Sequence, residues 1–516
     1  MIPVIPKPQN AQLSEGHFIL TSNTVIFTFS EFSHIAHFLY EMIKNQFGYE
    51  IQISQKTRDS NIIMIQIDSD SEELGEEEYV LDIKKNSIRV SAKFEKGAFY
   101  GVQSLFQLIR EREEYLAIPQ MRIDDYPRFS YRGFMLDVGR HYHPVDTIKK
   151  ILDLMALLKL NVFHWHLTED QGWRIEIKKY PKLIEIGSKR KDTKIGGYIP
   201  GFYRGKPHEG FYTQEEIKEV VNYAQERFIQ VIPEIEIPGH CSAALASYPE
   251  LSCTGQHIEV KTKGGIYSDI YCAGKESTFD FLQDVLDEIV ELFPSDIIHI
   301  GGDEAPKKRW KKCTECQERI RKEGLKDEHE LQVYFTNRIS EYLKSKGKTI
   351  MGWNQILDES MDHSAIVQWW LGRGKTRYKY LRKGRKFVMS NMSKTYLDYS
   401  YLMFPLRKFY DFNPIPKKLE EAYHENVLGI ESPLWTEWVP NIDRLGWQIF
   451  PRLIAISEVA WTEKSKKNYE DFMQRLPSLL KIINSLDFPF AKIEETDPGF
   501  WKRIILFYKW FIWPFV

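Results

Sequence analysis

The sequence contains few cysteines, almost no net charge, and no repeats or low-complexity tracts. Its 516 residues include five cysteines, a count that is both odd and sparse. Such a count argues against a disulfide framework and favours a reducing compartment. The formal net charge of −2 gives no global indication of a nucleic acid or another polyanion as partner.

Two of the cysteines, Cys313 and Cys316, have the Cys-x-x-Cys spacing that occurs in zinc sites. No second Cys/His pair at ligand spacing follows them, so this motif offers at most half a zinc site. The sequence therefore predicts no metal site and no cofactor.

The N-terminal residues 1–6 lack the basic region and the apolar stretch of a secretory signal. If this N-terminus is native, we expect a cytoplasmic protein. If a signal peptide was removed, the compartment is unknown.

Aromatic residues, in contrast, are abundant: they make up 14% of the chain and include 13 Trp and 27 Tyr. Most of them belong in a large core. Trp and Tyr also offer flat apolar faces with a polar edge, which suits them to bind sugar rings.

The length of the chain suits an α/β barrel of roughly 250–400 residues together with one more domain. Residues 1–125 predict a small α/β domain, and residues 124–128 are typical of a linker. The pattern predicts strands at 25–29 and 62–67, a hairpin of strands 79–83 and 87–91, and a helix at 100–112.

From residue 132 onward, apolar strand-like runs alternate with amphipathic helical stretches or long loops. Eight strands are expected, at 134–138, 161–167, 229–237, 296–300, 348–353, 365–370, 387–391 and 427–431. Helices are expected at 146–160, 213–228, 277–293, 329–346 and 447–460. The pattern predicts a (β/α)8 TIM barrel over residues 126–470, followed by a C-terminal helix and an aromatic, basic tail over 471–516.

Polar and aromatic residues follow every one of these strands. Carboxylates, histidines, one arginine and indoles would therefore meet at the carboxyl-end rim of the barrel, where such folds place their chemistry. Carboxylates beside a wall of indoles fit a pocket for a neutral sugar.

The fourth strand ends in Gly301-Gly302-Asp303-Glu304, two glycines followed by two adjacent carboxylates. Taken alone, Asp303 and Glu304 could equally begin a helix, because a helix dipole favours acids there. As neighbours on an extended strand, they are expected to point to opposite faces. That geometry suits neither a glycosidase with its own nucleophile nor an inverting one.

Several motifs resemble the β-N-acetylhexosaminidases of glycoside hydrolase family 20. They are RGFMLDVGRH at 132–141, FHWHLTEDQGWR at 163–174, PEIEIPGH at 233–240, HIGGDE at 299–304, GW at 352–353, YLDY at 396–399 and LWTE at 434–437. The stretch GAFYGVQ at 97–103 resembles the end of that family's N-terminal α/β domain.

The resemblance implies substrate-assisted catalysis, in which the 2-acetamido oxygen of the sugar attacks the anomeric carbon. Glu304 is then the general acid and later the base. Asp303 holds the acetamido N–H and stabilises the oxazolinium charge, and Tyr396 donates to the acetamido oxygen.

The same resemblance implies a set of substrate-binding residues. Arg140, Asp398 and Glu437 are expected to bind ring hydroxyls, and Trp353, Trp370 and Trp435 to enclose the acetamido methyl and the sugar face. Asp170 and His240 are expected to support proton transfer at Glu304, although His240 could equally be a capping or core histidine.

Some positions depart from the family pattern. Glu169 and Glu236 stand where Asp is usual, and Asn354-Gln355 follows Trp353 where an acid is common at the second position. Trp369 and Leu371 flank Trp370 where Ser and Arg are frequent. The last two departures put the shape of the leaving-group side in question.

The resemblance thus implies an exo-acting, retaining β-N-acetylhexosaminidase that releases terminal β-linked GlcNAc, or GalNAc, from an oligosaccharide or glycoconjugate. A disaccharide-releasing relative of the family and a non-catalytic sugar-binding barrel are the alternatives. No nucleic-acid partner is expected.

The tail at 500–516 is dense in aromatics, with three cations and no acids. It is too short and too charged to span a bilayer. It is expected either to lie on a membrane surface or to pack on the barrel or on a second copy in a homodimer.

Overall fold

The computed structural model describes residues 2–67, 73–113, 115–195, 202–372, 374–499, 501, 502 and 504. The chain divides into two compact units. The first comprises Met1–Arg132, Asp153–Leu160 and Ile454–Pro489, and the second comprises Gly133–Leu152, Asn161–Leu453 and Phe490–Val516. The predicted domain boundaries at residues 125 and 470 stay predictions.

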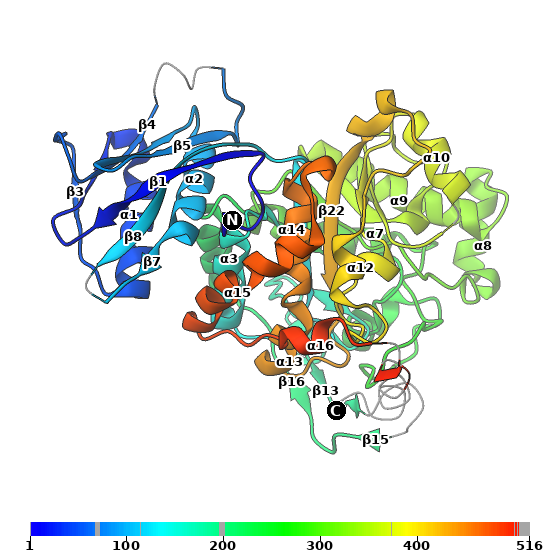
Figure 1. Ribbon diagram of the computed structural model, residues 1–516. Coiled ribbons are helices and arrows are strands. Elements are labelled where there is room, and N and C mark those ends of the chain that lie inside the picture. The colour runs from blue at the N-terminus through cyan, green and yellow to red at the C-terminus, as the bar shows by residue number, and fades with distance from the viewer. Residues whose placement is uncertain are drawn as a thin grey trace. The chain divides into compact units, whose positions relative to one another are not determined.

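The first unit contains a mixed sheet in the order β1-β8-β5-β6-β4-β2-β3, with the short β7 (Arg110–Glu111) beside β8. Its strands are β1 (Asn10–Leu20), β2 (Val25–Thr28), β3 (Gln52–Ser54), β4 (Ile62–Gln66), β5 (Tyr79–Ile83), β6 (Ser87–Ser91) and β8 (Leu116–Asp125). Helices α1 (Ser33–Phe47) and α2 (Glu95–Leu108) contact each other and the strands, so both cover the same face of the sheet (Figure 1).

The predicted hairpin is confirmed, because β5 and β6 pair in antiparallel fashion. The predicted linker at 124–128 is wrong at its start, because Asp124 and Asp125 are the last residues of β8. The carboxylate of Asp125 is buried and accepts hydrogen bonds from the Tyr79 hydroxyl at 2.6 Å and the Lys159 ammonium at 2.9 Å. These bonds fix the end of the strand where the sequence shows only polar residues.

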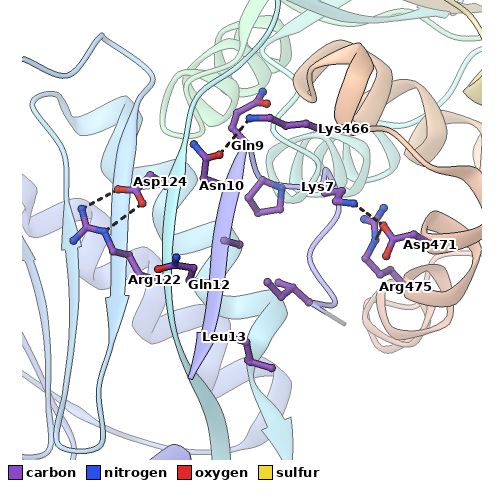
Figure 2. Close-up of a pocket in the computed structure, with 13 residues that line it drawn as sticks. Lys7, Gln9, Asn10, Gln12, Leu13, Arg122, Asp124, Lys466, Asp471 and Arg475 are labelled. Atoms are coloured by element: carbon purple, nitrogen blue, oxygen red, sulfur yellow. Dashed lines mark hydrogen bonds and ion pairs between the residues drawn. The ribbon is translucent and has the colours of Figure 1, made fainter. Parts of the chain in front are cut away.

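Figure 2 shows a pocket of the first unit that is lined by residues of β1, β8 and α15 (Tyr469–Ser485). Charged side chains of its lining pair with one another: Lys7 lies 3.1 Å from Asp471, and Arg122 lies 2.9 Å from Asp124. None of the predicted site residues lines this pocket.

The second unit is a closed barrel in the order β10-β17-β18-β19-β20-β21-β22-β9. Its strands are β9 (Tyr131–Asp137), β10 (Val162–His166), β17 (Gln230–Glu234), β18 (Ile297–His299), β19 (Thr349–Trp353), β20 (Ile366–Trp369), β21 (Phe387–Met389) and β22 (Val427–Leu434). The pairings along the barrel are parallel. The predicted TIM-barrel fold is confirmed.

Helices follow most of the strands, among them α3 (Val145–Leu157), α5 (Gln214–Gln225), α7 (Glu276–Leu292) and α9 (Glu328–Ser345). Helix α5 begins with a capping box, in which Thr213 and Glu216 each accept from the other's backbone N–H. Helix α7 buries an apolar face that includes Leu282, Leu286 and Ile289, at the three- and four-residue spacing of one helix side.

The helix predicted at 447–460 is two helices, α13 (Ile442–Ile449) and α14 (Arg452–Trp461). Pro451 separates them, because proline lacks the N–H that a helix interior requires and clashes with the preceding turn. Among the described residues, no helix is long and apolar enough to cross a membrane.

Candidate active site

The predicted site residues, together with other polar residues of the same motifs, lie at the carboxyl ends of the barrel strands or in the loops that follow them. Asp137 ends β9, His166 ends β10 and Glu234 ends β17, while Trp435 directly follows β22. Because all strands of a parallel barrel end at the same rim, these groups lie close together.

The loop after β18 carries both candidate catalytic carboxylates. The strand ends at His299, and the loop then takes left-handed backbone at Gly301 (φ +64°), Gly302 (φ +95°) and Glu304 (φ +41°). A Cβ at Gly301 would lie 1.9 Å from a carboxylate oxygen of Glu236, so any side chain there would have to displace that carboxylate and adopt the left-handed backbone that favours glycine.

The expectation that Asp303 and Glu304 point to opposite faces is wrong, because the extended strand has already ended. Both carboxylates face His240, whose Nε2 lies 3.5 Å from Glu304 Oε2 and 3.9 Å from Asp303 Oδ2. The left-handed backbone at Glu304 turns its side chain to the same side as that of Asp303.

His240 connects these two carboxylates to a second pair. Its Nδ1 lies 2.7 Å from Glu169 Oε1 and 3.2 Å from Asp170 Oδ2. Asp170 is itself held by the backbone N–H of Ser242 at 2.9 Å. His240 therefore lies between two pairs of carboxylates and not in an apolar core.

The charges of this cluster shift the pKa values of His240 and Asp303. Burial alone would lower the pKa of His240, but the Glu169 carboxylate and hydrogen bonds to Asp170 and Glu304 raise it well above the usual value. Burial raises the pKa of Asp303 to about 6, with the His240 charge opposing the rise and the Glu234 charge adding to it.

Arg140 is buried and held from several sides. Its Nη2 lies 2.9 Å from Glu169, its Nε donates to Gln171 at 3.1 Å, and its guanidinium lies 4.7 Å from the centre of the Trp435 ring. Asp137 accepts the backbone N–H of Arg140 at 3.1 Å. These contacts fix the guanidinium fork in one direction.

Below the rim, Glu234 collects hydrogen bonds from several elements. It accepts from Trp353 Nε1 at 2.8 Å, and it contacts His164, at 3.0 Å, and His166. Although burial raises the pKa of Glu234, the charges of His299, His166 and His164 outweigh burial and hold it well below the usual range.

The predicted aromatic wall forms. The Trp353 and Trp435 ring centres are 5.6 Å apart, and Trp370 stacks on Tyr396 at 6.2 Å with the ring planes 21° apart. Tyr396 lies 6.3 Å from Trp435, which joins the two pairs. The structure thus brings the phenol and the three predicted indoles together.

Asp398 and Glu437 interact with each other electrostatically. Burial, with the Glu437 charge adding to it, raises the pKa of Asp398 to about 8. Burial also raises the pKa of Glu437, against the charge of Arg140, which lowers it. The Arg140 guanidinium thus belongs to the same electrostatic cluster as these two acids.

Several buried polar atoms of this site have no hydrogen-bond partner among the described residues, and three of them belong to predicted site residues: Arg140 Nη1, Asp303 Oδ1 and Asp398 Oδ1. A buried polar atom without a partner costs free energy, so such an atom calls for a partner, which water or a bound ligand can supply. One donor and two acceptors around an aromatic wall match a ring that carries several hydroxyl or amide groups.

The sequence assigns no role to several residues that build this site. Asp137 and Glu234 are expected at the rim only from their places at strand ends, Gln171 lies in a motif without a predicted role, and Glu169 differs from the family pattern. The position of each near a strand end was the available signal. The partner that gives each its role comes from another strand and is visible only in three dimensions.

The departures after Trp353 and around Trp370 have a structural account. Asn354 Oδ1 accepts the backbone N–H of Trp370 at 3.0 Å and of Leu371 at 3.2 Å, and Gln355 accepts from Trp370 Nε1 at 2.8 Å. Asn354 and Gln355, the second of which stands where an acid is common, therefore position Trp370.

Comparison with known proteins shows the family to which this chain is similar. A model of the glycosyl hydrolase family 20 catalytic domain matches residues 129–464, and a model of domain 2 of the same family matches residues 1–126. A β-hexosaminidase of Porphyromonas gingivalis is 41% identical over 497 residues, which are 92% of this chain and 62% of that protein. The chain thus spans less than two thirds of that relative's length.

Solved structures show the same fold. An exo β-N-acetylglucosaminidase of Vibrio harveyi, in complex with N-acetylglucosamine, superposes with a TM-score of 0.85 at 30% identity. The superposed part is 95% of this chain and 78% of the Vibrio harveyi chain. A β-N-acetylhexosaminidase of Bacteroides fragilis superposes with a TM-score of 0.83 at 34% identity and covers 96% and 98% of the two chains. With both domain models matched in order along the sequence, this chain belongs to glycosyl hydrolase family 20.

Proposed function

We propose that this protein is an exo-acting, retaining β-N-acetylhexosaminidase that releases terminal β-linked GlcNAc, or GalNAc, through an oxazolinium intermediate. Family membership supports the reaction class, because family 20 enzymes use the substrate's own acetamido group in place of an enzyme nucleophile. The bound N-acetylglucosamine of the Vibrio harveyi relative supports the substrate class.

One observation carries the proposal: Asp303 and Glu304 face the same side of the site, and one buried oxygen of Asp303 has no hydrogen-bond partner in the described part of the chain. A carboxylate oxygen in that state can accept the acetamido N–H. Its charge then stabilises the positive oxazolinium ring as the ring forms.

In the first step, Glu304 protonates the glycosidic oxygen while the acetamido oxygen attacks C1. The bond from C1 to the leaving oxygen breaks, the aglycone leaves with the proton, and the oxazolinium ring closes. The Glu304 side chain is 33% exposed, so it can reach a leaving group that extends towards solvent. Tyr396 donates to the acetamido oxygen and directs it towards C1.

In the second step, Glu304 takes a proton from a water molecule whose oxygen attacks C1 and opens the ring. Two inversions at C1 give net retention. Through its contact with Glu304, His240 acts as a positioning residue that carries a positive charge beside the carboxylate when Glu304 is ionised.

Recognition of the sugar falls to the other side of the pocket. Arg140 would donate to two neighbouring hydroxyls through its planar fork, and Asp398 and Glu437 would accept from hydroxyls at O4 and O6. Trp353, Trp370 and Trp435 would enclose the acetamido methyl and the sugar face.

A comparison of three aryl β-glycosides, those of GlcNAc, GalNAc and glucose, tests this proposal. We expect release from the first, with or without the second, and almost none from the glucoside. Cleavage of the glucoside at a comparable rate would contradict acetamido participation. Cleavage of none of them would favour the sugar-binding barrel, and release of disaccharides only would favour the disaccharide-releasing relative.

The contact expected of the tail at 500–516 is a separate proposal. Of this segment, the structure describes Trp501, Lys502 and Ile504, all of them exposed, and the other residues lie outside the described ones. Packing on the protein or a homodimer, rather than a membrane surface, stays our prediction.

A further inference from the structure

Four of the five cysteines gather at one place, away from the residues assigned to the reaction. Cys253 and Cys272 come from the segment between the short helix η3 (Pro249–Leu251) and α7, whereas Cys313 precedes and Cys316 lies in α8 (Thr314–Glu323). The sulfur of Cys272 lies 3.6 Å from that of Cys313 and 3.6 Å from that of Cys316, which is 3.8 Å from that of Cys253.

These separations match the edges of a metal–thiolate tetrahedron. Four sulfurs at about 2.3 Å from a central Zn²⁺ lie about 3.8 Å from one another. A disulfide requires about 2.05 Å. All four sulfurs lie within 4.8 Å of one another, as a single central ion requires.

The surroundings are those of a closed site. Cys272, Cys313 and Cys316 are buried, and Cys253 is half-buried. The backbone N–H of Gly274 points to the Cys272 sulfur and that of Cys316 to the Cys313 sulfur. Such N–H···S contacts orient thiolate ligands and offset their charge.

Gly274 shows how closely the two segments approach here. A Cβ at this position would lie 2.2 Å from the backbone carbon of Glu315 and 2.4 Å from the backbone nitrogen of Cys316. The segment between η3 and α7 therefore contacts the backbone at the start of α8 beside the cysteine cluster.

We propose that Cys253, Cys272, Cys313 and Cys316 bind one Zn²⁺ as a structural site. Four protein ligands leave no open position for water or substrate, so the ion takes no part in the reaction. The sequence spacing indicates only Cys313 and Cys316 as a pair, because the other two cysteines lie upstream and Cys272 precedes Cys313 by 41 positions.

The metal would hold together two loops that reach the catalytic rim. The loop that contains Cys253 and Cys272 also contains Lys261, whose N–H donates to the Asp170 carbonyl at 3.1 Å, and Gly264, which packs against Glu437. The loop from β18 to Cys313 carries Asp303 and Glu304. An ion pair of Arg309 with Asp269 at 2.8 Å joins the same two loops.

The metal content of the full chain, purified without a metal-affinity tag, tests the assignment. We expect about one zinc per chain and five titratable thiols in denaturant with chelator. Absence of zinc together with a mass lower by four hydrogens, the sign of two disulfides, would overturn the proposal. Iron in place of zinc would overturn the choice of metal. Replacement of the zinc by Co²⁺ should give the intense visible absorption of tetrahedral cobalt thiolate.

Variants then assign the ligands. Cys253→Ser should lose the zinc and lower the midpoint of thermal unfolding, and Cys253→His should retain zinc, because imidazole is also a zinc ligand and Cys253 has the most exposed position. Cys241→Ser is the matched control: it removes a buried cysteine outside the cluster and should leave zinc content unchanged. Zinc lost from Cys241→Ser, or kept by Cys253→Ser, would contradict the site. If Cys253→Ser does not fold, the spectrum of the cobalt-substituted wild-type protein still tests the site, because a protein without the tetrahedral thiolate site would lack the intense visible absorption.

Discussion

At the scale of single residues, Asp303 and Glu304 are adjacent carboxylates whose surroundings give them different tasks. The Asp303 side chain is 12% exposed and has an oxygen without a hydrogen-bond partner among the described residues, whereas the Glu304 side chain is 33% exposed and contacts His240. The buried group suits a fixed charge that stabilises a cation, and the exposed one suits transfer of a proton to and from groups that enter and leave.

Substitution of each carboxylate by its amide should separate the two roles. Glu304→Gln should lose roughly 10²–10⁴-fold in rate on substrates with poor leaving groups, and much less on activated aryl glycosides, which need little acid assistance. Asp303→Asn should lose rate on both, because the oxazolinium charge is then uncompensated. Steady-state rates on a series of aryl leaving groups measure this; the same dependence in both variants would show that the assignment is wrong.

The pKa of Asp303 makes a second prediction. Because burial raises this pKa to about 6 and the charged form is the one that acts, kcat/KM should fall as the pH drops through about 6. His240 opposes that rise with its positive charge, while Glu234, Glu304 and Glu169 add to it. His240→Asn should therefore move the acid limb of the profile to higher pH. A profile of kcat/KM against pH that keeps its acid limb unchanged in this variant would contradict the coupling.

At the scale of elements, the loop after β18 places the carboxylates, and it depends on glycine. Gly301 combines left-handed backbone with a close approach to Glu236, whereas Gly347, which follows α9, has similar backbone (φ +76°) with nothing within 4 Å of its Cβ position. The two glycines share the backbone strain of a substitution but differ in the steric clash. They therefore form a matched pair.

Gly301→Ala should lower kcat/KM on the order of 10²-fold, because a displacement of the loop by about 1 Å misplaces both carboxylates. It should also cost stability, through about 1–3 kcal/mol of backbone strain and the clash in addition. Gly347→Ala should cost a similar strain energy with no loss of activity. Kinetics and thermal unfolding of both variants check this, and a Gly301→Ala enzyme with unchanged activity would show that this loop conformation does not position the carboxylates.

The barrel could be predicted from the sequence because its strands are buried on both faces and appear as short apolar runs. The N-terminal sheet was predicted less completely: β1 is mostly exposed and lacks an apolar run, so its sequence gives no strand signal.

The site residues could be named from motifs. Their contacts could not be predicted, because Glu169, His240 and Glu304 follow three different barrel strands, β10, β17 and β18. The four cysteines show the same limit, since the second pair of ligands lies upstream, in another loop, and not at a close spacing.

At the scale of the whole molecule, every residue assigned to the reaction lies in the second unit, between 140 and 437. The segment at 500–516 contributes none of them, although it holds many aromatic side chains. Each large apolar side chain contributes ~1.5–3 kcal/mol when fully removed from water. A handful of such side chains is enough to hold the segment either on protein or on a membrane surface.

Deletion of residues 500–516 should therefore leave activity on aryl glycosides unchanged while it alters solubility or oligomeric state. Because we expect the tail to pack on protein, the full-length chain should stay in the supernatant when it is centrifuged with anionic vesicles at low salt, where electrostatic attraction to the lipid is strongest. Analytical ultracentrifugation of the two forms measures the oligomeric state, and the truncated form serves as the vesicle control. Sedimentation of the full-length chain with the vesicles, lost on truncation, would instead show that the cationic and aromatic side chains bind the membrane surface.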